Sequence, residues 1–143
     1  MRTVIQRVGK GERNSHIKKA VAEIYVDDLI LKEATADLSL PGETENLYKS
    51  IKKRGIEIEY LVNNAGFGIL GKTIQESDPG RFIKMLRINV MALSELTLLF
   101  LPEMIRRKRG YILNVSSMAG YIVPHGVGAG SAPYGAFLPR YRW

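Results

Sequence analysis

Residues 58–62 form a short, mostly apolar run that passes directly into a turn of asparagine and glycine residues at 63–68. A run of this kind is typical of a strand whose two faces are both covered, as in a parallel sheet. Parallel strands are joined by crossover segments, usually helices that pack on the sheet. This one segment therefore favours an α/β fold.

The elements around this strand alternate in type. Three segments are rich in residues that favour strands: 2–8, 29–36 and 111–115. Three segments have apolar residues at helical spacing and predict helices: one capped by Asn14 or Ser15 and ending near Tyr25, one at 43–54 and one at 80–108. The alternation predicts βαβ units and therefore a parallel, Rossmann-like sheet flanked by helices.

The predicted helix at 80–108 contains the most apolar stretch of the chain. Glu95 and Glu103 interrupt this stretch, and a bilayer span needs ~20 mostly apolar residues, so we expect a buried helix and no membrane segment. Its apolar surface widens at residues 98–101 beyond what one packed face requires. This widening makes the helix the candidate surface for homo-oligomer formation.

Charge and cysteine content narrow the class of partner. The formal net charge is +7, but the basic clusters lie at the carboxyl ends of two predicted helices. Cations there interact favourably with the helix dipole and need no binding partner. We therefore expect no nucleic-acid binding. The chain has no cysteine, so it has no disulfide or thiolate metal cluster, and no metal site is predicted. Residues 1–20 lack the apolar core of a secretory signal, and we expect a cytoplasmic protein.

Polar residues and glycines gather at the carboxyl ends of the predicted strands. Asp37 follows one strand, residues 63–66 follow the next, and residues 116–117 follow a third. In open α/β sheets, ligands bind in the crevice beyond these strand ends. The arrangement predicts a crevice of the kind that binds nucleotides.

Four motifs in this region resemble those of the short-chain dehydrogenase/reductase family. In chain order they are Asp37-Leu38-Ser39, then Leu61-Val62-Asn63-Asn64-Ala65-Gly66, then Arg87-Ile88-Asn89-Val90, and finally the strand and turn from Gly110 to Gly120 that contain Ser116-Ser117. The resemblance extends from about residue 36 to residue 124. It divides the chain into a partial dinucleotide-binding domain at 1–124 and an irregular Gly/Pro-rich tail at 125–143.

The resemblance implies hydride transfer between a nicotinamide cofactor, NAD or NADP, and a small carbonyl or alcohol substrate. It also implies roles for individual residues. Ser117 would hydrogen-bond the substrate oxygen, Asn89 would hold a proton-relay water, and Tyr134 is the candidate acid/base. The implied cofactor-binding residues are Asp37, Leu38, Asn64, Ala65 and Gly66.

Several of these residues also have structural interpretations. Ser116 and Ser117 are common turn residues, and Asn89 on an apolar helix stripe fits a satisfied core amide. Asn64 fits a tie between two strands, and Asp37 fits a cap for the following helix. The joint occurrence of four motifs favours family descent, but it leaves activity open.

The amino-terminal part departs from the family pattern. The family has a glycine-rich loop before a helix that receives the pyrophosphate. The segment around Gly9 and Gly11 lacks the third glycine, and too few residues separate it from Asp37, so about one βα unit is expected to be missing. In an alternative register, Arg13 and Asn14 follow the second family strand. Arg13 would then suit a 2′-phosphate, which favours NADP over NAD.

The carboxyl-terminal part departs further. Tyr134 resembles the family's catalytic tyrosine, but Leu138 occupies the position of the lysine that follows it. The last family strands are also expected to be missing. The sequence therefore predicts an impaired NAD(P)-dependent oxidoreductase. The alternative is a non-catalytic α/β fragment that acts as a binding or oligomerisation module.

Overall fold

The structure is a computed structural model that describes residues 2–8, 20–26, 29–69, 75–117 and 141–142. Six strands are described: β1 (Arg2–Val8), β2 (Ala20–Val26), β3 (Leu29–Thr35), β4 (Tyr60–Asn63), β5 (Tyr111–Asn114) and β6 (Tyr141–Arg142). The helical elements are α1 (Glu43–Lys53), α2 (Pro79–Leu86), the π-helical turn η1 (Arg87–Ala92) and α3 (Leu93–Arg107).

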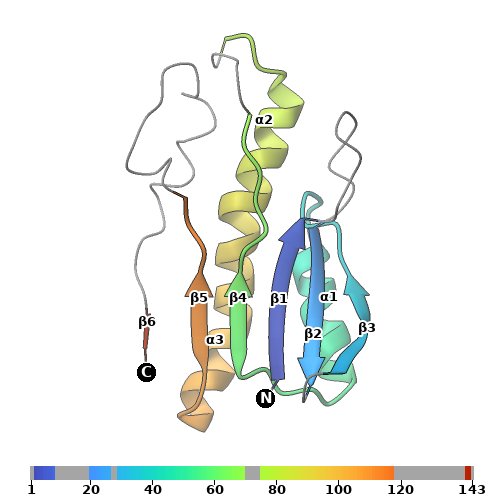
Figure 1. The fold of residues 1–143 in the computed structure, drawn as a ribbon, viewed down its shortest axis with the longest axis vertical. Coiled ribbons are helices and arrows are strands. Elements are labelled where there is room, and N and C mark those ends of the chain that lie inside the picture. The colour runs from blue at the N-terminus through green and yellow to red at the C-terminus, as the bar shows by residue number, and fades with distance from the viewer. Residues whose placement is uncertain (1, 9–19, 27–28, 70–74, 118–140, 143) are drawn as a thin grey trace.

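The strands form one sheet in the order β3-β2-β1-β4-β5-β6. Its centre is parallel, because β4 runs parallel to both β1 and β5. The helices lie against one face of this sheet, behind the strands in the view of Figure 1. The prediction of a Rossmann-like α/β fold is confirmed. The sheet is not parallel throughout, since β2, which lies between β3 and β1, and the edge strand β6 run antiparallel to their neighbours.

The predicted helix ending near Tyr25 is wrong, because residues 20–26 form strand β2. This strand pairs with β1 along its whole length, from Arg2 opposite Val26 to Val8 opposite Ala20. Its sequence is rich in β-branched and aromatic residues, which fit a pleated sheet better than a helix. Asn14 and Ser15, the predicted caps, lie outside the described residues.

Helix α1 follows the predicted boundaries closely. It begins after Gly42, which has a left-handed backbone with φ of 81°, and Gly55 follows it with φ of 66°. Leu47 and Ile51 point inward as the spacing predicted, and Thr44 is buried beside them. The side chains buried between α1, α3 and the sheet form the core: Ala36, Leu38, Leu47, Ile51, Ile58, Leu61, Ile88, Ala92, Leu96, Phe100, Met104 and Ile112.

Elements α2, η1 and α3 follow one another without a break and together form the predicted long helix. Asp78 caps its start by accepting a hydrogen bond of 2.7 Å from the Arg81 amide. By length and hydropathy alone, Pro79–Arg107 would also suffice to cross a bilayer, contrary to the expectation from its sequence. Core helices of soluble proteins meet the same criterion, so this finding is weak evidence for a membrane. One stripe of the helix packs on the core, while Leu98 on the outer face is 70% exposed.

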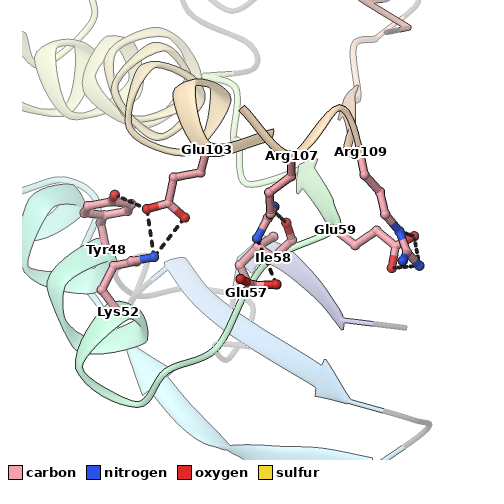
Figure 2. Close-up of polar contacts among 8 residues, drawn as sticks. All are labelled: Tyr48, Lys52, Glu57, Ile58, Glu59, Glu103, Arg107 and Arg109. Atoms are coloured by element: carbon pink, nitrogen blue, oxygen red, sulfur yellow. Dashed lines mark hydrogen bonds and ion pairs between the residues drawn. The ribbon is translucent and has the colours of Figure 1, made fainter. Parts of the chain in front are cut away.

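Polar contacts join α1, α3 and the start of β4 at the amino ends of the parallel strands (Figure 2). Glu103 accepts hydrogen bonds from the Tyr48 hydroxyl at 2.8 Å and from the Lys52 ammonium at 2.9 Å. Burial alone would raise the pKa of Glu103, but the hydrogen bonds from Lys52 and Tyr48 outweigh it and lower that pKa. Arg107 donates to the Ile58 carbonyl at 2.7 Å. These contacts fix the end of the sheet opposite the predicted crevice.

Candidate functional site

Strands β3, β1, β4 and β5 all run in the same direction, so their carboxyl ends lie at one edge of the sheet. The segments that follow β3 and β4 extend from this edge (Figure 1). In open α/β sheets, this edge is where ligands bind. The turn before α1, the turn after β4 and the residues after β5 are therefore the elements of the candidate site.

A side-chain amide on the long helix holds the turn after β4. The Phe67 amide donates to Asn89 Oδ1 at 3.0 Å, and Asn89 Nδ2 donates to the Phe67 carbonyl at 2.8 Å. Asn89 is buried and lies on the π-helical turn η1, and π-helical turns occur often at functional sites. Because both Oδ1 and Nδ2 of Asn89 are hydrogen-bonded to Phe67, the interpretation of Asn89 as a satisfied core amide is confirmed. The relay-water role of Asn89 stays a prediction.

Gly66 is packed directly against this amide. A Cβ atom at Gly66 would lie 3.2 Å from Asn89 Oδ1, which is tighter than an ordinary van der Waals contact. The turn therefore carries no side chain where it meets the helix. Ala65 beside it is half-buried and Asn64 is exposed at the edge. A turn with little side-chain bulk can accept a ligand close to its backbone.

The tie between strands is made by Asn63, whereas the sequence analysis assigned it to Asn64. Asn63 is 2% exposed, and its Nδ2 donates to Asn114 Oδ1 at 2.8 Å and to Thr97 Oγ1 at 3.1 Å. Asn114 and Thr97 also belong to this cluster, and neither was among the residues predicted from the sequence. The signal was available in the strand period, because Asn63 lies two residues after the buried Leu61 and so shares its face.

Asp37 forms a closed turn with the residues that follow it. The Ser39 amide and hydroxyl both donate to Asp37 Oδ1, at 3.1 and 2.7 Å, and the Leu40 amide donates to the Asp37 carbonyl at 2.9 Å. The interpretation of Asp37 as the cap of α1 is wrong, because Gly42 is the N-cap and no side chain caps it. Leu38 is buried in the core, so only its main chain can reach a ligand.

Ser116 and Ser117 follow β5 at the same edge. The Val115 amide donates to the Asn63 carbonyl at 2.9 Å, which extends the pairing of β5 with β4 beyond the strand ends. Ser116 is exposed and Ser117 is half-buried. Tyr134 and Arg13, the other predicted site residues, lie outside the described residues. Within the described ranges, no three His, Asp or Glu side chains group as a metal site.

Three kinds of group are available to a ligand at the described edge. It offers a carboxylate acceptor at Asp37, an exposed amide at Asn64 and a turn with little side-chain bulk at Gly66. A Rossmann-like sheet with such groups at its carboxyl edge is typical of the class of nucleotide-binding α/β proteins.

Comparison with known proteins gives the family. The sequence model described as short chain dehydrogenase matches residues 5–136. The chain belongs to the short-chain dehydrogenase family. Its predicted resemblance to that family is thereby confirmed.

Individual relatives agree with this assignment. A very-long-chain 3-oxoacyl-CoA reductase from Anas platyrhynchos is 41% identical over 91 residues, which cover 55% of this chain and 27% of that protein. A metagenomic short-chain oxidoreductase solved in complex with NADP has a TM-score of 0.64 and 30% identity, covering 69% of this chain and 44% of that one. A short-chain dehydrogenase from Streptomyces avermitilis has a TM-score of 0.64 and 27% identity, covering 70% of this chain and 36% of that one. The chain thus spans less than half the length of each of these relatives.

Proposed function

We propose that this chain is an NAD(P)-dependent oxidoreductase of the short-chain type, with impaired activity. The reaction is hydride transfer between the nicotinamide ring and a small carbonyl or alcohol. The observation that carries the proposal is the clamp of Asn89 on Phe67, which holds the Asn64–Gly66 turn at the carboxyl edge of a Rossmann-like sheet. Family membership supports it independently.

The cofactor supplies the hydride chemistry, so the chain must bind it and manage one proton. In this proposal Asp37 accepts a hydrogen bond from the adenine amino group, and the Asn64–Gly66 turn borders the cofactor. Ser117 hydrogen-bonds the substrate oxygen and Tyr134 exchanges the proton. A free tyrosine has a pKa of ~10. With Leu138 in place of the lysine, no ammonium at that position lowers this pKa, and proton transfer is slow.

Arg13 favours NADP over NAD in one of the two registers left open by the sequence, because a guanidinium pairs well with a 2′-phosphate. The NADP complex of the metagenomic relative agrees with this preference. We also propose a cytoplasmic location, without nucleic acid or membrane as partner.

A second function has one observation in its favour. The outer face of the long helix exposes Met91, Leu98 and Ile105, an apolar stripe at seven-residue spacing. Large exposed apolar patches are typical of contact surfaces. A non-catalytic module that binds a partner or forms a homo-oligomer through residues 80–108 is therefore the alternative.

The experiment is a turnover assay of the purified chain with NADPH and a panel of aldehydes, ketones and 3-oxoacyl thioesters, with Ser117→Ala as the control. We expect a kcat well below the usual range of about 1–10³ s⁻¹, and a further loss in the control. A kcat inside that range would contradict the impairment. Activity equal in the chain and the Ser117→Ala variant would remove Ser117 from the reaction.

A further inference from the structure

Within the part of the chain that the structure describes, the Asp37 carboxylate is held at one of its two oxygens. Two donors of Ser39, its amide and its hydroxyl, both bind Oδ1. Among the residues that the structure describes, none donates a hydrogen bond to Oδ2. The neighbouring Leu38 is 1% exposed and anchors this turn in the core.

These contacts remove two kinds of freedom from the carboxylate. The buried Leu38 and the bond from the Leu40 amide to the Asp37 carbonyl fix the main chain of the turn. The Ser39 hydroxyl, at 2.7 Å, is the shorter of the two bonds to Oδ1 and restrains the side-chain rotation. Oδ2 is left as the acceptor for a ligand at the carboxyl edge of the sheet.

We infer that Ser39 is a positioning residue, which orients Asp37 so that the site selects adenine over a purine with an oxo group at position 6. The inference rests on the proposed function. An amino group at that position donates to the carboxylate in a charge-assisted hydrogen bond. An oxo group would face it acceptor to acceptor, and a site built to hydrogen-bond one group of a ligand rejects an analogue that cannot make that bond. The selection needs a fixed carboxylate, because a mobile one turns away from the oxo group.

The test compares NADPH with its deamino analogue, which carries hypoxanthine in place of adenine. Both dissociation constants are measured by nicotinamide fluorescence for the unmodified chain, Ser39→Ala and Ser39→Thr. We expect the unmodified chain to prefer NADPH by about tenfold or more, the size of one hydrogen bond to a charged group. Ser39→Ala should bring the ratio within about threefold, and Ser39→Thr, which keeps the hydroxyl, should restore the preference.

The matched control is Ser50→Ala, which removes a half-buried hydroxyl from α1 and should leave the ratio unchanged. If the role of Ser39 is purely structural, Ser39→Ala weakens the binding of both dinucleotides equally, and the ratio of the two dissociation constants stays as in the unmodified chain. That result would overturn the inference. No saturable binding of either dinucleotide to the unmodified chain would overturn the proposed function, and the inference with it. The two failures are therefore distinguishable.

Discussion

Replacing Gly110 by alanine is expected to destabilise the chain by about 3 kcal/mol, because the site has no room for a methyl group. A Cβ atom at Gly110 would lie 2.4 Å from Cγ and 2.6 Å from Cβ of Met104. Met104 is 3% exposed, so its stem cannot move aside without disturbing the core. The measurement is urea unfolding, where the midpoint should fall while the slope stays constant.

Two further variants separate a collision at Gly110 from a general effect of alanine. Gly80→Ala adds a methyl group 3.4 Å from Asp78 Oδ2, an ordinary contact, and should change stability by less than about 0.5 kcal/mol. Met104→Ala removes Cγ and Sδ, two of the three atoms that a methyl group at Gly110 would collide with, and leaves a cavity. Combined with Gly110→Ala, it should destabilise less than the sum of the single changes by at least about 1 kcal/mol. Strict additivity would show that Cγ and Sδ of Met104 are not what excludes the methyl group.

Asn89→Ala is expected to destabilise the chain by about 2–3 kcal/mol. Its amide satisfies both the N–H and the C=O of Phe67, and each main-chain group left without a partner costs about 1–3 kcal/mol. Phe67 is partly exposed, so water can reach the two freed groups. The expected destabilisation therefore lies at the lower end of the sum for two such groups. Chemical unfolding measures this loss.

Asn64→Ala is the matched control for Asn89→Ala, because it removes the same side chain from an exposed position of the turn that Asn89 holds. We expect it to change stability by less than about 0.5 kcal/mol. If both variants unfold at the same urea concentration, the Asn89 amide does not hold the turn. The observation on which the proposed function rests would then be lost.

The central elements could be predicted because each has its own periodicity. Helix α1 has apolar residues at helical spacing, and β4 and β5 are short apolar runs bounded by glycine or asparagine. Strand β2 could not be predicted in this way. Its apolar residues fit helical spacing while its β-branched and aromatic residues favour a strand, so pairing with β1, which is a tertiary contact, decides between the two.

The candidate site could be predicted in location but not in its contacts. Asp37, the Asn64–Gly66 turn and Ser117 each follow a predicted strand. Because these strands are parallel, the three segments lie at the same edge of the sheet, which could be predicted from the order of the motifs. The exchange of Asn63 and Asn64 arose from a shift of one residue, which in a strand moves a side chain to the opposite face. The role of Thr97 could not be inferred, since a lone threonine on an apolar helix gives no local signal of its partner.

Binding of a nicotinamide dinucleotide at this edge is the central claim, and a titration of the purified chain with NADPH and NADH tests it most directly. Nicotinamide fluorescence should show saturable binding with a Kd on the order of 0.1–1 mM, about 4–5.5 kcal/mol, since no complete glycine-rich loop is available for the pyrophosphate. NADPH should bind more tightly than NADH. The absence of saturable binding of either dinucleotide at millimolar concentration would contradict the claim, and the chain would then keep the fold of the family without its cofactor.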